Sequence, residues 1–261
     1  MLIIKDMEQR HKLTTVMSII LIFSLVSMNE SNAFFTSEKE VEREARLEWL
    51  RMKRSLPTPE DPRIQQFVQC IADNIISVLE EPYASMDWEV RVFDDDSTNA
   101  FAMPGGKIGV FTGIFKVADT PDALAAVIGH EIAHLTESHV IERARNQSRN
   151  DMLVILGNAA TGLGDYIQTG TTLLLSLPFD RGQESEADKV GLDYMSKAGY
   201  DPRSSIYLWK NMEEVSDGAP PEFLSTHPSG DTRMSDLVGA MTPALINFNE
   251  ASNQNKRYNC L

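Results

Sequence analysis

Three of the five histidines in this chain lie within one short segment, GHEIAHLTESH, which runs from Gly129 to His139. Side chains four residues apart share one face of an α-helix, so His130 and His134 can direct both imidazoles at one metal ion. Glu131 lies about 100° further round the helix, close enough to contact a water molecule on that ion. This HExxH spacing is that of two zinc ligands and a general base, and chance rarely produces it.

A catalytic zinc ion usually has three protein ligands and one open position. On an unbroken helix, His139 would lie about 140° away from His134, so we expect it to pack or support rather than bind. The downstream segment QESEAD is a better source, because Glu184 and Asp188 share one helical face. We predict that Glu184 binds zinc and that Asp188 accepts a hydrogen bond from the distal N–H of His130 or His134. Without the HExxH motif, this segment would be interpreted as a solvated acidic face.

The sequence Ser-Thr-His-Pro places His227 in a loop near the C-terminus. From there it could reach the zinc from the open side, and two roles remain open. It could stabilise the tetrahedral intermediate, or it could occupy the fourth position and hold the enzyme shut. Arg233 is a rival for the first of these roles.

The elements that would position these residues are mainly helices. The segments WEVRVFDD and NAFAMPGGKIGVFTGIF predict three strands, with a PGG turn between the second and third. Residues 151–179 are apolar but interrupted by glycines, which favours a buried helical hairpin; a lid in peripheral contact with a membrane is the alternative. Apolar spacing and capping residues predict helices over 38–56, 63–80, from Thr120 through the histidines, 181–199, 200–215 and 233–241.

The N-terminus has the pattern of a signal peptide over residues 1–33, with a basic start, an apolar run and a small-x-small site at Ser31-Asn32-Ala33. An uncleaved membrane anchor is the alternative, although the apolar run is shorter than the roughly 20 residues of a membrane span. We therefore predict an exported chain. Its mature part is divided into an exposed helix with a linker (34–58), the main domain (59–245) and a C-terminal tail (246–261).

Charge and cysteine content narrow the class of protein further. The formal net charge of −14 argues against a nucleic-acid-binding surface, which is usually basic. The two cysteines, Cys70 and Cys260, could pair in an oxidising compartment. They could equally remain a buried thiol and a frayed terminal one.

Taken together, the motifs resemble the M48 family of zinc metallopeptidases, in particular its soluble, exported bacterial members. The resemblance implies a mainly helical α+β fold, a gluzincin-type domain with a small β-sheet over the active-site helix and one Zn²⁺ per chain. It implies Glu184 as third ligand, a supporting role for Arg181 and, without spanning helices, a periplasmic location. The matching pieces are NAFAMPGGKIGVFTG at 99–113, HEIAH with His139 and Arg143 after it, RGQESEAD at 181–188 and STHPSGDTR at 225–233.

The expected activity is that of an endopeptidase, with Glu131 as general base on zinc-bound water. The substrate would lie extended along the strand edge at 99–103, so unfolded or envelope proteins are the expected partners. One alternative is a zinc-bound periplasmic chaperone or assembly factor with regulated or secondary proteolysis. A deformylase would need an upstream cysteine ligand, and Cys70 lies far away in a packing helix. An aminopeptidase would need an anionic pocket, for which only Glu186 or Glu137 is available.

Overall fold

The computed structural model describes residues 37–146, 178–215, 222–228, 231–254 and 260. The expected signal peptide and nearly all of the expected hairpin at 151–179 lie outside these residues. Within the described part of the chain, no helix is both long enough and apolar enough to cross a membrane.

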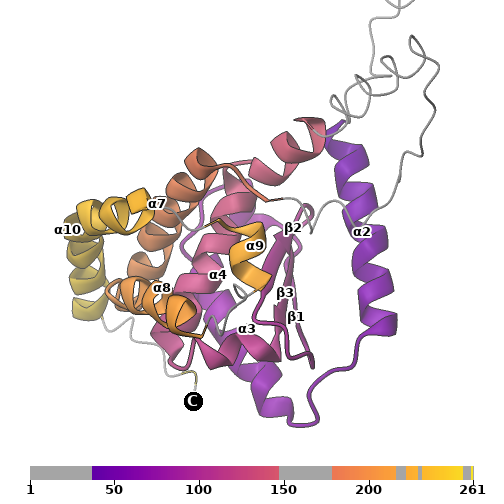
Figure 1. The fold of residues 1–261 in the computed structure, drawn as a ribbon, viewed down its shortest axis with the longest axis horizontal. Helices are drawn as coiled ribbons and strands as arrows, with labels where there is room; N and C mark the ends of the chain where they lie inside the picture. Colours follow the sequence, from indigo (N-terminus) through magenta and orange to yellow (C-terminus); the bar gives the residue numbers. More distant parts are fainter. Residues whose placement is uncertain (1–36, 147–177, 216–221, 229–230, 255–259, 261) are drawn as a thin grey trace, which may run out of the picture.

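The histidine-bearing helix α4 lies at the centre of the molecule (Figure 1). It runs from Pro121 to Thr136, and the Thr120 side chain caps it by accepting from the Ala123 N–H. Its residues from Ala123 to Leu135 are all buried, as expected of a helix packed on several sides. The helices around it are α3 (Pro62–Ile76), α7 (Arg181–Lys197) and α8 (Ser204–Glu214). The mainly helical α+β fold is confirmed.

A three-stranded sheet lies against α4 in the order β1-β3-β2. Strand β3 pairs in parallel with β1 and antiparallel with β2, and the expected PGG turn joins β2 to β3. Gly105 and Gly106 in this turn have φ of 83° and 71°, a conformation that a side chain would disfavour. The edge strand β2 faces the histidine helix. The strands are β1 (Glu89–Phe93), β2 (Ala100–Met103) and β3 (Lys107–Phe111).

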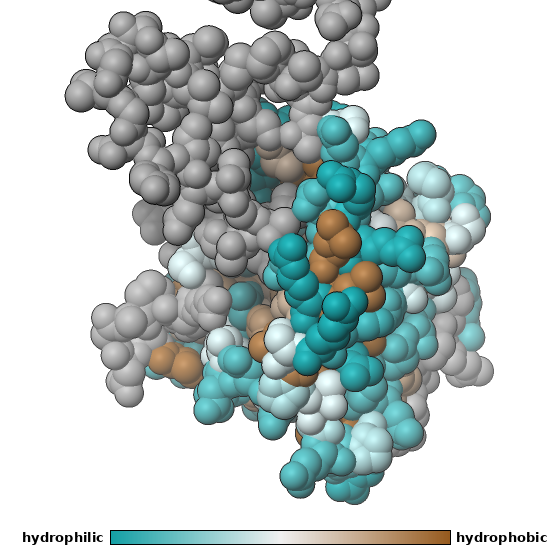
Figure 2. Space-filling model, turned by 90° about the vertical axis from the view of Figure 1, so that its right-hand side faces the viewer, coloured by the Kyte–Doolittle hydropathy of each residue, from teal (hydrophilic) through white to brown (hydrophobic). Residues whose placement is uncertain are grey.

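Helix α2, Glu38–Ser55, covers the other side of the sheet (Figure 1). The expectation of an exposed helix holds for one face only. The surface on this side is mainly hydrophilic and includes a small group of hydrophobic residues (Figure 2). The sparse apolar stripe of α2 is buried because it packs on Phe93, Phe101 and Met103 of the sheet. The buried residues of the stripe are Val41, Ala45, Trp49 and Met52.

Several predicted helix ends are wrong. Helix α8 begins at Ser204 rather than at residue 200. Helix α3 ends at Ile76 rather than Glu80, because the chain turns through i→i+3 bonds after that point. Helix α10 runs from Asp231 to Asn253, so the segment predicted as a tail from 246 begins as helix. Pro243 lies exposed within this helix, while buried side chains on either side keep α10 packed on α7.

Cys70 on α3 and Cys260 form a disulfide, which decides between the two alternatives for these residues. Their sequence separation is 190 residues, so the bond closes a long loop and lowers the conformational entropy of the unfolded chain. We expect reduction to lower the free energy of unfolding by about 3–5 kcal/mol, measured by urea denaturation. A Cys70→Ser/Cys260→Ser double variant should be equally destabilised and indifferent to reductant. Equal stability of the wild type with and without reductant would contradict this prediction.

Candidate metal centre and active site

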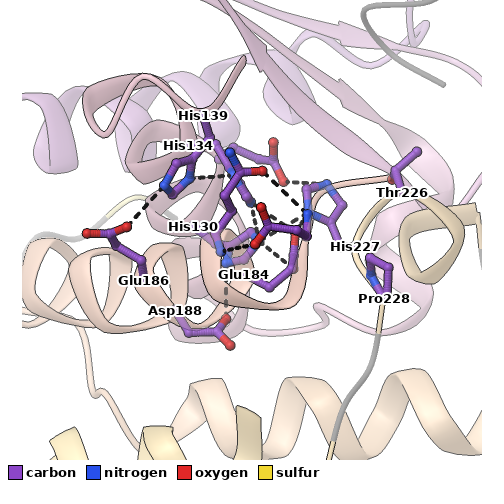
Figure 3. Close-up of polar contacts among 12 residues, drawn as sticks. His130, His134, His139, Glu184, Glu186, Asp188, Thr226, His227 and Pro228 are labelled. Carbon is purple, nitrogen blue, oxygen red and sulfur yellow. Dashed lines mark hydrogen bonds and ion pairs between the residues drawn. The ribbon is translucent and has the colours of Figure 1, made fainter. Parts of the chain in front are cut away.

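Four side chains converge on one point beside α4 (Figure 3). His130 and His134 come from α4, Glu184 from α7, and His227 from the loop after the short helix α9, Glu222–Thr226. One ligand atom of each lies within 4.8 Å of the others, and all four residues are buried. The structure thus brings together the three expected ligands and places His227 beside them as a fourth candidate ligand.

The spacing of these atoms suits a tetrahedral metal ion of zinc's size. His134 Nε2 lies 3.0 Å from His130 Nε2 and 3.3 Å from Glu184 Oε1. His227 Nδ1 lies 3.2 Å from His130 Nε2 and 3.0 Å from Glu184 Oε1. Four bonds of the lengths zinc makes to nitrogen and oxygen would separate the ligand atoms by roughly 3.3–3.6 Å, so the group would expand slightly to hold the ion. A carboxylate and three imidazole nitrogens around one point form a donor set that favours a cation.

Each histidine of the HExxH motif is also held from behind. His130 Nδ1 lies 3.1 Å from Asp188 Oδ1, the contact expected of a carboxylate that orients a ligand. His134 Nδ1 lies 3.0 Å from His139 Nδ1, and His139 Nε2 lies 3.3 Å from Glu186 Oε2. The supporting role expected for His139 is therefore a direct contact with a ligand.

The assumption of an unbroken helix through His139 is wrong. Helix α4 ends at Thr136, Ser138 takes a left-handed φ of 62°, and the chain is helical again from His139 to Asn146. This sharp turn brings the His139 ring back to His134. Spacing on a single helix therefore could not predict the contact.

Arg233 enters the site from α10, behind the ligands rather than in front of them. Its Nε donates to Asp188 Oδ2 at 2.7 Å and its Nη2 to Asp188 Oδ1 at 2.8 Å, while Nη1 pairs with Glu184. The guanidinium also stacks on the Trp209 ring at 3.8 Å. Burial acts to raise the pKa of Asp188, but the contacts with Arg233 and His130 outweigh it and lower that pKa. Arg233 therefore neutralises two buried carboxylates.

Glu131 lies between the metal-ligand group and the edge of the sheet. Its Oε2 accepts from the Ala102 N–H of β2 at 3.2 Å, and its Oε1 lies 3.4 Å from His227 Nε2. Burial raises the pKa of the Glu131 carboxyl to about 8. A bound cation would act in the opposite direction and favour the carboxylate.

Two phenylalanines that the sequence analysis missed cover the histidine rings. Phe179 stacks on His134 with ring centroids 3.8 Å apart. The Arg143 guanidinium lies over the same Phe179 ring, 3.8 Å from its centroid. Phe223 stacks on His227 at 4.3 Å. Burial lowers the pKa of Arg143 to about 10. No sequence signal distinguished these rings from ordinary core residues.

The resemblance assigned Arg181 to support the site, and the structure does not place it there. Arg181 is exposed at the start of α7. Among the described residues, the arginines beside the ligand group are Arg233, which is buried, and Arg143, which is half-buried.

Helices α4 and α7 touch backbone to backbone where two glycines meet. A Cβ atom on Gly191 would lie 2.7 Å from the His130 nitrogen, and one on Gly129 would lie 2.8 Å from the Gly191 oxygen. This contact is next to His130 on one helix and three residues after Asp188 on the other. Because glycine has no side chain, α7 can approach α4 closely enough for residues of both helices to reach one metal ion.

We expect Gly191→Ala to push the two helices apart, because its new Cβ would meet backbone atoms that cannot rotate away. The expected results are a loss of about 1–3 kcal/mol of stability and weaker zinc binding in a chelator competition. Gly239→Ala on α10 is the matched control, since nothing lies within 4 Å of its Cβ and alanine favours helix. Unchanged zinc binding in Gly191→Ala would show that the close contact does not set the site.

This arrangement defines a metallopeptidase domain. It combines a histidine pair on one helix, an acidic ligand from a second helix and a small sheet beside a buried glutamate. The model of Peptidase family M48 matches residues 60–241. The chain belongs to this family, whose members depend on a metal ion.

Several curated relatives carry protease names. The chain is 37% identical over 169 residues to Mitochondrial metalloendopeptidase OMA1 of Arabidopsis thaliana, covering 63% of this chain and 34% of that protein. It is 34% identical over 211 residues to Metalloendopeptidase OMA1, mitochondrial, of Danio rerio (74% and 44%). It is 27% identical over 215 residues to Beta-barrel assembly-enhancing protease of Escherichia coli O157:H7 (76% and 44%). The chain thus spans about a third to a half of the length of these relatives.

Proposed function

We propose that this chain is a zinc-dependent endopeptidase that hydrolyses peptide bonds in unfolded or misassembled exported proteins. The observation that carries the proposal is the position of Glu131, a buried carboxyl group between a four-atom ligand set and the outer edge of strand β2. Such a group can accept a proton from an attacking water and deliver it to the leaving amine.

The zinc ion would be held by His130, His134 and Glu184, with His227 in the remaining position. Bound there, it supplies Lewis acidity that polarises the scissile carbonyl and acidifies a water molecule. Asp188 holds the His130 ring and His139 the His134 ring, so the ligand nitrogens are already aimed before a metal ion arrives. The Ala102 N–H holds one oxygen of Glu131, which leaves the other for proton transfer.

The substrate would pair with the outer edge of β2, the edge turned away from β3. The Asn99 carbonyl accepts from the Phe111 N–H, so odd-numbered residues of this strand bond to β3. The backbone groups of Ala100 and Ala102 therefore face away from the sheet. Their N–H groups donate to the Asn99 and Glu131 side chains, so a substrate would bond to their carbonyls. An extended peptide that adds a strand there is bound mainly through its backbone, which suits unfolded segments of varied sequence.

An exported, periplasmic location has two supports. The Cys70–Cys260 disulfide favours an oxidising compartment. The N-terminal pattern over 1–33 favours export through a cleaved signal peptide, with an uncleaved anchor as the alternative.

The name of the E. coli relative, which refers to β-barrel assembly, supports envelope proteins as substrates.

His227 decides between the peptidase and a second candidate function. Its Nδ1 lies among the ligand atoms, a position that a substrate carbonyl or water would need. We assign His227 to the fourth position in this closed state, and once displaced it could donate to the oxyanion. A chain that rarely opens would act as a zinc-bound chaperone or assembly factor with secondary proteolysis.

The test is casein degradation by the purified chain and by a His227→Ala variant, with zinc content measured on both. We expect degradation by the wild type and faster degradation by His227→Ala, with one zinc ion bound per chain. A slower His227→Ala variant would favour the oxyanion role. No degradation by either form, with zinc bound, would favour the chaperone.

A further inference from the structure

The Phe223 side chain fills an apolar pocket beside the metal-ligand group. The residue is 1% exposed, and the centroid of its ring lies 5.9 Å from that of His130 and 6.1 Å from that of Trp209. A residual cavity of about 20 Å³ remains there. The apolar lining includes Ala126, Val127, Leu192, Met195, Leu208 and Trp209.

The same residue is bonded to the edge where a substrate would pair. The Phe223 N–H donates to the Thr98 carbonyl at 3.1 Å. Thr98 belongs to the even-numbered series that continues through Ala100 to Ala102, the residue whose N–H holds Glu131. Phe223 therefore combines a backbone bond to the outward edge with a side chain in a pocket next to a metal ligand. These are the two contacts that a bound substrate residue would make.

Phe223, which occupies the pocket, belongs to a short helix. Helix α9 has five residues, and a bond from the His227 N–H to the Phe223 carbonyl at 2.8 Å couples the pocket to the fourth metal position. A substrate that displaces His227 from the ligand group would therefore also displace the neighbouring phenylalanine. The polar lining residues are His130, Asp188 and Ser205. Asp188 is paired with Arg233 and His130, and the Ser205 hydroxyl donates to the Pro202 carbonyl, so these groups already have partners.

We propose that this pocket selects substrates by a bulky apolar side chain next to the scissile bond, and that Phe223 occupies it in place of that side chain. The proposal rests on the endopeptidase function above. The substrate class is a polypeptide with exposed Phe, Leu, Met or Tyr residues. Folded proteins bury such residues, so the pocket would confer a preference for unfolded chains.

Binding can be measured without catalysis in the full-length Glu131→Gln chain loaded with zinc. The probes are fluorescein-labelled extended peptides that differ at one position, which carries Phe, Leu, Ala or Asp, with anisotropy as the readout. We expect the Phe peptide to bind at least about tenfold more tightly than the Ala peptide, the effect of burying one aromatic side chain. Adding Phe223→Ala should strengthen binding of the Phe peptide several-fold, because the pocket is then free.

Two further variants separate pocket occupancy from folding. Leu224→Ala changes the neighbouring side chain of α9, which does not line the cavity, and should leave the affinities for all four peptides unchanged. Ala126→Leu narrows the pocket from the α4 side and should abolish the preference for Phe over Ala. Equal affinities for Phe and Ala peptides in the Glu131→Gln chain and in its Phe223→Ala form would overturn the proposal.

Mapping of cut sites in unfolded casein distinguishes this proposal from the function on which it rests. Enrichment of bulky apolar residues on one side of the cut, lost in Ala126→Leu, supports both. Cleavage without residue preference in the wild type and in Phe223→Ala overturns the pocket proposal and leaves the endopeptidase standing. Absence of cleavage together with a Phe preference in peptide binding retains the pocket and rejects the endopeptidase.

Discussion

Glu131→Gln should lower kcat for peptide hydrolysis by about 10²–10⁴-fold while zinc remains bound. Glutamine keeps an oxygen that can accept from the Ala102 N–H, so the strand edge and α4 should stay in register. What it loses is the ability to take a proton from water and return it to the leaving amine. Steady-state cleavage of a fluorogenic peptide, with metal content measured on the same samples, checks this result.

The matched control for this variant is Glu137→Gln, at the C-terminal end of the same helix and outside the ligand group. It makes the same chemical change and should retain wild-type activity and zinc content. Full activity in Glu131→Gln would remove Glu131 from the mechanism. Loss of zinc together with activity would assign it a structural role instead.

Arg233→Met should destabilise the metal-free protein by about 3–5 kcal/mol, because it leaves two buried carboxylates without a cation. Methionine can replace much of the packing of the arginine stem, but it cannot pair with Asp188 and Glu184. Since these residues orient and supply metal ligands, zinc affinity should fall by about 10–100-fold. Urea denaturation in chelator and zinc titration with a fluorescent competitor measure the two effects.

The control is Arg203→Met, which also breaks a two-pronged pair, here with Asp201. The Arg203 side chain is 62% exposed, so its pair is screened by water and its loss should cost no more than about 1 kcal/mol. Similar destabilisation by the two changes would mean that Arg233 does not compensate buried charge. Wild-type zinc affinity in Arg233→Met would show that it does not position the ligands.

Most of the secondary structure could be predicted from local patterns. The caps at Ser37 and Thr120 and the stop at Gly199 mark helix ends, because each satisfies or releases specific backbone groups. The alternation in WEVRVFDD and the PGG turn locate the strands. The helix predicted over 233–241 was too short, because buried residues on both sides of Pro243 keep α10 on α7 as far as Asn253.

The grouping of His130 and His134 with Glu131 follows from the sequence alone. The geometry of one helix places the two histidines, four residues apart, on one face with the glutamate beside them. The choice of Glu184 and Asp188 follows from the same rule applied to a second helix. Both predictions need only short-range geometry and the chemistry of zinc.

Only the tertiary structure decided what surrounds that set. His227 enters from a loop, Arg233 from α10 and Phe179 from the segment before α7, and no spacing along the chain relates them to α4. The left-handed turn at Ser138 redirects His139, and the contact between Gly129 and Gly191 brings the two ligand helices together. These features depend on how separate elements pack in three dimensions, and short-range periodicity in the sequence carries no information about that packing.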